Sequence, residues 1–470
     1  MVALAVAAAL ALIPSATRAQ SVNPSTPIEA PKPHPDAPAP PETADPAQSV
    51  APAPAPAAPS VKERFLVGKF PDKPSLPPAW SIPVEPLGFT APGAIYLGSR
   101  NSLASLDFLD ENHLLFTFRV PGLLRRDTVN GQDSDEHERQ IRAVVLTLPQ
   151  GTVEAETLWT LHDTARYLWM LKNGHFLLRD RNNLLMGDAT LVLKPFLDFP
   201  GSLLWLELDP AQKFIVTNSR EPVAERQKPG LVPSPSTASA RVTSDEDSDA
   251  AEGGHPEMVV RILRRESGEV MLVSRARSTV HLPINSIGYL ENLRGRGTQW
   301  VLNLSYFTGG TKMLASVDSA CEPDDNFVSE QEILVTGCGP GGETKLMAMS
   351  TEGRTLWVSQ APSTEIWPQL TVAPNGSRLA WATLDVNHAV NSYAPIGAED
   401  VKEQSVTVFD AASGDIALVT PLAPILDVGG NVAISPSGRR VAVINAGAIQ
   451  VFELPPPPPL PVSVDNHPGK

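Results

Sequence analysis

The sequence predicts an all-β fold and, within that class, a ring of seven four-stranded sheets, which is a β-propeller. Short apolar strands alternate with polar turns over most of the 470 residues. A sequence pattern that predicts two successive β-hairpins recurs along the chain. When three long insertions are set aside, the region 94–454 divides into seven units of roughly 40 residues, the usual length of a propeller blade. A ring of six or eight blades and a pair of β-sandwiches are the alternatives.

The composition fits a globular protein with disordered additions. Hydrophobic residues make up 42% of the chain, enough for a large core, while the 48 prolines point to extended segments outside it. The formal net charge of −15 opposes binding to a phosphate backbone, whose affinity for proteins depends on clustered cations. Nucleic acid is therefore excluded as an expected partner.

The N-terminal region reads as an export signal followed by a spacer. An apolar run from Val2 to Ile13 and small residues up to Ala19 predict a signal peptide at 1–19, and the run is too short to cross a bilayer. Proline and alanine make up 23 of the 40 residues from Ser21 to Ser60, which predicts a disordered linker over 20–62. The mature chain is expected to be periplasmic or secreted, without a transmembrane segment.

The next regions are taken in chain order. A lead-in segment is expected at 63–93, the propeller at 94–454 and a proline-rich tail at 455–470. Each blade is expected to start with an apolar strand, a polar turn and a second apolar strand, followed by a second hairpin with glycine in its turn. First strands are expected near Leu103, Arg166, Leu203, Ile287, Asp325, Gln369 and Asn431.

The seventh unit meets the proline tail before it reaches a fourth strand. A ring needs that strand because an open edge exposes unpaired backbone groups. The segment Ala94–Gly98, which precedes the first blade, is the expected source of the closing strand.

Three long insertions, at 121–139, 219–257 and 385–403, interrupt the repeat. Each is expected between the second and third strand of its blade, which places all three on one face of the ring. The segment 219–257 is rich in Pro, Ser, Ala and acidic residues and is expected to be disordered. Insertions gathered on one face of a repeat protein often mark its binding side.

Two turns carry a family resemblance. Pro374-Asn-Gly-Ser-Arg378 and Pro436-Ser-Gly-Arg-Arg440 resemble the Pro-Asp-Gly-Lys turns of WD-like bacterial β-propeller repeats. The arrangement is similar to uncharacterised exported propellers of soil bacteria such as acidobacteria, over about three-quarters of the chain. The resemblance implies a surface that other proteins bind.

The sequence assigns no catalytic residue, cofactor site or metal site. Among the nine histidines there is no His-x-x-x-His pair, and no phosphate-binding loop occurs. Polar side chains of the first strands are expected to face the axis of the ring, and the candidates are Asp107, Arg166, Glu207, Glu291, Asp325 and Gln369. They match no known acid, base and metal set.

The function expected from the sequence is an exported, non-catalytic module that binds or scaffolds another envelope or extracellular protein. The alternative is a carbohydrate-active or lactone-cleaving enzyme with an axial pocket. Three or more carboxylates or histidines converging on the axis would favour the enzyme.

Cys321 and Cys338 are the only cysteines of the chain and are expected to form a structural disulfide. Their midpoint falls in the Ser329–Gln331 turn, between two apolar strands, so they lie opposite each other in one hairpin. A bridge of this loop length stabilises a fold by roughly 3 kcal/mol in the chain-entropy model.

Overall fold

The computed structural model describes residues 62–65, 76–91, 104–120, 138–162, 166–221, 257–388, 396–397, 399–426 and 430–457. All of them belong to the compact unit Pro59–Lys470. The signal peptide predicted at 1–19 lies outside these ranges, and so do nearly all of the linker predicted at 20–62, most of the acidic insertion and residues 458–470 of the predicted tail.

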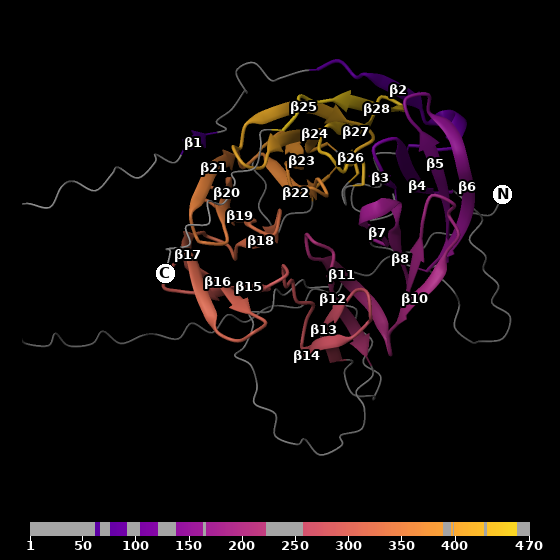
Figure 1. Ribbon diagram of the computed structural model, residues 1–470. Coiled ribbons are helices and arrows are strands. Elements are labelled where there is room, and N and C mark those ends of the chain that lie inside the picture. Colours follow the sequence, from indigo (N-terminus) through magenta and orange to yellow (C-terminus); the bar gives the residue numbers. More distant parts are fainter. Residues whose placement is uncertain are drawn as a thin grey trace, which may run out of the picture. The chain divides into compact units, whose positions relative to one another are not determined.

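The described strands form seven sheets that stand around a central axis, and this confirms the predicted seven-bladed β-propeller (Figure 1). Blade one consists of β3 (Ser105–Phe108), β4 (His113–Arg119), β5 (Arg139–Thr147) and β6 (Thr152–Leu161). Blade two consists of β7 (Leu168–Met170), β8 (Phe176–Asp180), β9 (Asn183–Gly187) and β10 (Lys194–Asp198). Blade three consists of β11 (Ser202–Leu208), β12 (Phe214–Glu221), β13 (Glu257–Arg264) and β14 (Val270–Ala276).

The other four blades follow in chain order. Blade four contains β15 (Gly288–Arg294), β16 (Gln299–Tyr306) and β17 (Thr311–Asp318). Blade five contains β18 (Asp324–Phe327), β19 (Glu332–Cys338), β20 (Thr344–Ser350) and β21 (Thr355–Ala361), to which β1 (Lys62–Phe65) adds in parallel. Blade six contains β22 (Glu365–Val372), β23 (Arg378–Val386), β24 (Val401–Asp410) and β25 (Ile416–Leu422). Blade seven contains β26 (Val432–Ile434), β27 (Arg440–Asn445), β28 (Ala448–Glu453) and β2 (Trp80–Pro83).

The ring is closed by β2, so the prediction that residues 94–98 supply the last strand is wrong. Trp80 pairs with Val451 and Pro83 with Ala448, in an antiparallel ladder on the outer edge of blade seven. Behind β2, a short 3-10 helix (Glu85–Leu87) leads to Phe89, whose ring packs 5.3 Å from each of the rings of Phe116 and Phe118. The lead-in segment is therefore part of the propeller and joins blade seven to blade one.

In blade four, the strand that was expected to be the first of the blade is in fact the second. The three hydrogen-bonded strands are the second, third and fourth of the blade. The extended segment 280–285 takes the inner position, where Ile284 forms an antiparallel bridge with Tyr289 of β15. Leu290 donates its backbone N–H to the carbonyl of Pro283, and Asn285 donates its backbone N–H to the carbonyl of Gly288. Since Pro283 has no N–H, this segment does not form a regular ladder. The first strand expected near Ile287 is thus the second strand, β15.

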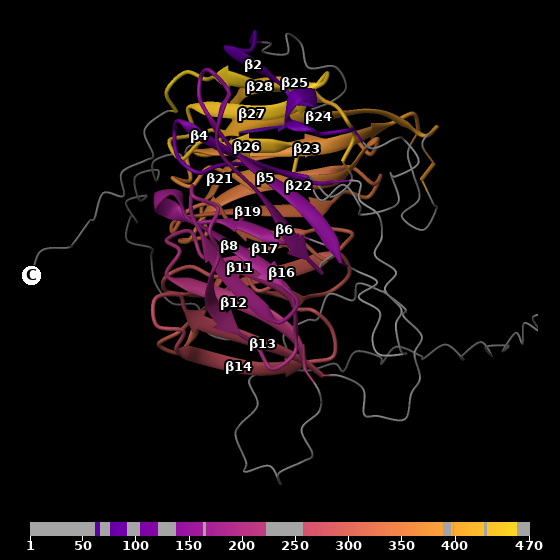
Figure 2. The same cartoon turned by 90° about the vertical axis from the view of Figure 1, so that its right-hand side faces the viewer.

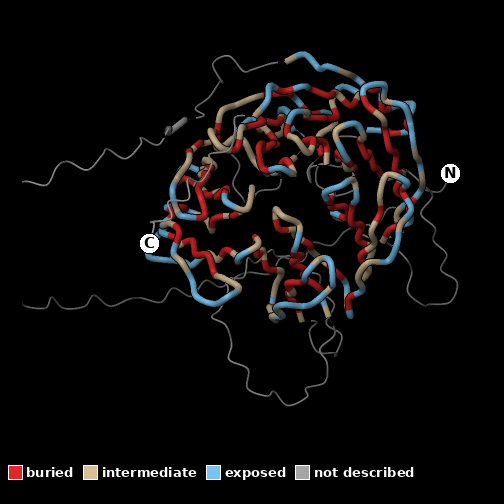
Figure 3. Tube along the Cα trace, in the orientation of Figure 1, coloured by how far each residue is buried: buried red, intermediate tan, exposed pale blue. Residues whose placement is uncertain are grey.

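The hydrophobic core lies within and between the blades, while the outermost strands are more exposed (Figure 3). Trp357 is buried between blades five and six, stacked on Phe409 at 5.9 Å, and its indole N–H donates to the carbonyl of Ala411. Tight packing of this kind between neighbouring sheets holds each blade against the next.

The structure joins Cys321 and Cys338 in a disulfide, as the sequence predicts, with their Cα atoms 5.4 Å apart. Cys338 ends β19 and Cys321 lies just before β18, so the bond fixes the entry to blade five.

The two faces of the ring carry different connections, as the side view in Figure 2 helps to follow. We call insertion face the side with second-to-third and fourth-to-first strand connections, and turn face the opposite side. The three long insertions leave the ring between β4 and β5, between β12 and β13 and between β23 and β24. All three are second-to-third connections and start from the insertion face, as predicted. The flanking strands set their bounds at 120–138, 222–256 and 387–400, so the second and third connections are shorter than predicted.

Candidate functional site

Five of the six polar residues expected at the axis belong to two neighbouring groups. Asp107 on β3, Arg166 directly before β7 and Glu207 on β11 interact electrostatically. Glu291 on β15 and Asp325 on β18 line one pocket. Gln369 on β22 has no described contact with either group. Glu291 also differs from the prediction in its position, because β15 is a second strand rather than a first.

The first group forms an arc across blades one to three. Burial raises the pKa of Asp107 to about 6, although the hydroxyl of Ser105 and the charge of Arg166 both oppose the rise. Burial lowers the pKa of Arg166, against the pull of Asp107 and Glu207. The guanidinium of Arg166 lies 5.4 Å from the ring centre of Trp169 and interacts electrostatically with both carboxylates. These charges compensate one another within the arc.

His281 links this arc to the second group. Its Nδ1 lies 3.1 Å from Oε2 of Glu207, and its Nε2 lies 2.8 Å from the backbone carbonyl of Asp325 and 3.5 Å from Oδ1 of Asp324. Burial of the ring opposes protonation, but the carboxylates of Glu207 and Asp324 outweigh it and raise the pKa of His281 to about 10. His281 is therefore an imidazolium at neutral pH, with both N–H groups engaged.

Asp325 is the most deeply buried carboxyl of the second group, with 2% of its surface exposed. Its Oδ2 accepts a hydrogen bond of 2.5 Å from Nδ2 of Asn292, which also donates to the carbonyl of Pro323. Burial, together with the charge of Asp324, raises the pKa of Asp325 to about 7. Asp325 thus changes charge in the physiological range.

A small pocket of about 40 Å³ lies beside these residues, between the inner segment of blade four and β18. It is lined by Val280, His281, Leu282, Pro283, Leu290, Glu291, Asn292, Glu322, Pro323, Asp324 and Asp325. Glu322 and Pro323 belong to the connection from β17 to β18, which is a fourth-to-first connection. The pocket therefore lies toward the insertion face.

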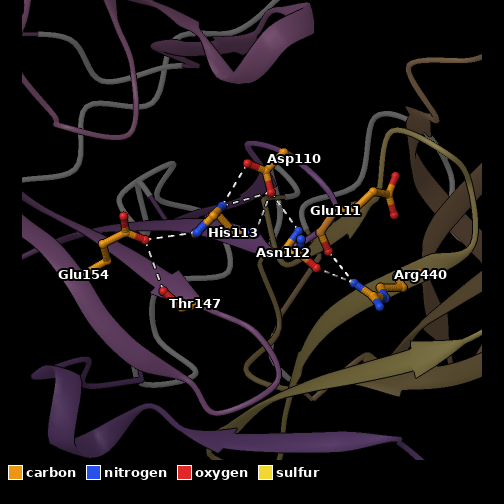
Figure 4. Close-up of polar contacts among 7 residues, drawn as sticks. All are labelled: Asp110, Glu111, Asn112, His113, Thr147, Glu154 and Arg440. Carbon is orange, nitrogen blue, oxygen red and sulfur yellow. Dashed lines mark hydrogen bonds and ion pairs between the residues drawn. The ribbon is translucent and has the colours of Figure 1, made fainter.

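A second polar cluster lies on the turn face, where blade seven meets blade one (Figure 4). Both ring nitrogens of His113 face carboxylates, with Nδ1 2.8 Å from Asp110 and Nε2 3.0 Å from Glu154. Arg440 donates to the carbonyl of Glu111 and lies over the ring of Trp80 at 5.0 Å. The contacts of this cluster connect β2, β27 and the first turn of blade one, so we assign it to ring closure.

The sequence analysis did not identify four residues of the pocket as candidates for a functional site: His281, Asn292, Glu322 and Asp324.

Within the described residues, no group of three or more His, Cys, Asp and Glu side chains is arranged to hold a metal ion. No described helix has the length and apolar character required to span a membrane.

Comparison with known proteins places the chain by fold. No protein-family model matches it, and no curated protein matches it in sequence. Among solved structures, it is similar to an acylaminoacyl peptidase from Pyrococcus horikoshii, with 10% identity and a TM-score of 0.41, over 73% of this chain and 49% of that one. The chain thus spans about half the length of these peptidases.

Two further structures are covered over more of their own length. One is the β-propeller domain of the Trilobed protease from Pyrococcus furiosus, with 10% identity and a TM-score of 0.40, over 75% of this chain and 93% of that one. The other is TolB from Acinetobacter baumannii, with 12% identity and a TM-score of 0.34, over 67% of this chain and 74% of that one. At these identities the likeness concerns the β-propeller fold alone.

Proposed function

We propose that this chain is an exported, non-catalytic binding module of the cell envelope, which captures a partner protein on the insertion face. The observation that carries the proposal is the common origin of the three long insertions, each of which replaces a short second-to-third connection on that face. Loops on a rigid scaffold are where repeat proteins place their contacts with partners.

Two properties support the compartment and the kind of partner. A disulfide between the only two cysteines fits an oxidising compartment, such as the periplasm or the extracellular space. The net charge of −15 favours association with a cationic protein surface, since complementary charge speeds encounter and selects partners.

The second candidate function is the carbohydrate-active or lactone-cleaving enzyme, and it rests on the axial groups. Asp107, Asp325 and His281 have pKa values of about 6, 7 and 10, and such perturbed values gather at catalytic sites. Four carboxyl groups and His281 line the same pocket, so the criterion of three or more carboxylates or histidines, which favours the enzyme, is met there. The adjacent pocket of about 40 Å³, however, is far smaller than the roughly 300 Å³ or more of ordinary small-molecule sites. Its size favours binding over catalysis.

We expect deletion of residues 122–138 or 387–402 to abolish capture of the envelope partner while the ring stays folded. Both deletions shorten insertions that leave the insertion face. Deletion of 122–138 keeps both flanking strands, whereas deletion of 387–402 also removes Val401 and Lys402, the first two residues of β24. The measurement is affinity capture from envelope fractions, compared with wild type, with circular dichroism as a check of folding.

The matched control lengthens a loop on the turn face. Residues Gly309 and Gly310 join β16 to β17, and a Cβ at either would meet nothing within 4 Å, so two extra residues fit there. This variant should capture the partner as wild type does. Unchanged capture by both deletion variants would contradict the proposed face.

A further inference from the structure

The pocket between blades four and five contains hydrogen-bond acceptors that lack donors. Among the described residues, no donor reaches Oδ1 of Asp325 or Oδ1 of Asn292, although both atoms are buried. The orientation of the Asn292 amide is fixed because its nitrogen donates to Pro323 and to Asp325. Buried acceptors without partners are costly, and a native protein keeps them where a ligand or water completes them.

The charge of the pocket indicates which kind of ligand could donate hydrogen bonds to these acceptors. Four carboxyl groups line it, those of Glu291, Glu322, Asp324 and Asp325. The one cationic side chain in its lining, His281, already directs its nitrogens at Glu207 and at the backbone and side chain of blade five. The pocket is therefore negatively charged and rich in hydrogen-bond acceptors. A cationic group that has hydrogen-bond donors and no acceptors would match it.

The size of the pocket limits that group. A volume of about 40 Å³ holds about three waters, given roughly 10–15 Å³ for each. A primary ammonium, with three N–H donors on one compact atom, fits this space and matches the acceptors. A planar guanidinium with five donors is larger and needs a wider, flat site.

We propose that this pocket binds the ammonium group of a lysine side chain from the protein that docks on the insertion face. The inference rests on the proposed function and deepens it by naming the anchoring contact. Because the pocket admits a terminal ammonium and little more, the rest of the ligand must lie outside it. Glu322 and Pro323 line the pocket and belong to a connection on the insertion face, so a docked partner would approach from there.

The test uses the full-length chain and the peptide acetyl-Gly-Lys-Gly-amide as probe, with binding followed by ligand-observed NMR. The peptide with norleucine in place of lysine has nearly the same length and no charge. We expect the lysine peptide to bind, and the norleucine peptide to bind at least about tenfold more weakly, as loss of a charged hydrogen bond implies.

The variant Asp325→Asn should weaken binding of the lysine peptide by about tenfold or more, because its amide places a donor beside the incoming ammonium. The exchange is isosteric and removes a buried charge, so the variant should fold. Glu266→Gln is the control: it removes one charge from an exposed turn between β13 and β14, on the turn face, and should bind like wild type.

Four results would overturn the proposal. The first three are equal binding of the lysine and norleucine peptides, unchanged binding by Asp325→Asn, and binding of methylammonium chloride as tight as that of the peptide, which would mark a site for free amines. Displacement of the peptide by calcium chloride at equal concentration, with sodium chloride at matched ionic strength inert, would instead identify a metal site and also contradict it. If the insertion deletions still abolish partner capture in that case, the proposed function stands and only the lysine anchor fails.

Discussion

A chain that begins at residue 92 is expected to lose its cooperative unfolding transition. It lacks β2 and the buried side chains Ile82, Val84, Leu87 and Phe89, which belong to the core cluster between blades seven and one. Burial of each such side chain contributes roughly 1.5–3 kcal/mol, so together they approach the whole stability of about 5–15 kcal/mol of an ordinary domain. Thermal unfolding followed by circular dichroism measures the effect.

The matched control is a chain that begins at residue 60, which keeps β1 and β2 and should melt like the full-length chain. Phe89→Ala is a milder variant and should cost roughly 3–5 kcal/mol, since it leaves a cavity against Phe116 and Phe118. An unchanged melting temperature for the chain that begins at residue 92 would show that β2 does not close the ring.

Asp325→Asn is expected to stabilise the protein, and to do so only above acidic pH. Burial raises the folded-state pKa of Asp325 from 3.8 to about 7. A carboxyl whose pKa is raised by folding lowers stability as pH rises, because the unfolded chain releases its proton first. The penalty is absent below pH 4, grows between pH 4 and 7, and reaches a ceiling of roughly 4 kcal/mol above that range.

The groups that face Asp325 set this dependence. Asp324 and Glu322 oppose its ionisation, while Asn292 and His281 favour it. Chemical denaturation of wild type and variant at pH 4, 6 and 8 should show nearly equal stabilities at pH 4 and an advantage for Asp325→Asn at pH 8. A variant less stable than wild type at pH 8 would show that Asp325 is ionised and well solvated in the folded state.

The blade count was predictable because each unit repeats its own turn chemistry. The closing strand was not, since prolines at positions 77, 78 and 83 make the segment around Trp80 resemble a linker. An outermost strand pairs on one side only and tolerates Pro83 at its end. Ala94–Gly98 has the stronger strand pattern, but local pattern does not decide which segment meets β28.

The pocket was predictable only in part. Asp325 was expected at the axis because it is a polar residue on an expected first strand. His281 was missed because Pro283 disrupts the ladder of its segment, so β15 took the place of the first strand in the prediction. Its partners Glu207 and Asp325 are distant in sequence and meet it through the packing of three blades. Such contacts follow from the ring as a whole.

The most direct test of the account is hydrogen–deuterium exchange on the complex with the captured envelope partner. The central claim is that the partner docks on the insertion face over the acidic pocket. We expect protection on binding in peptides covering 280–292 and 319–325, with no change in the turn-face segments 109–112 and 351–354. Protection of those two turns, with unchanged exchange around the pocket, would contradict the claim.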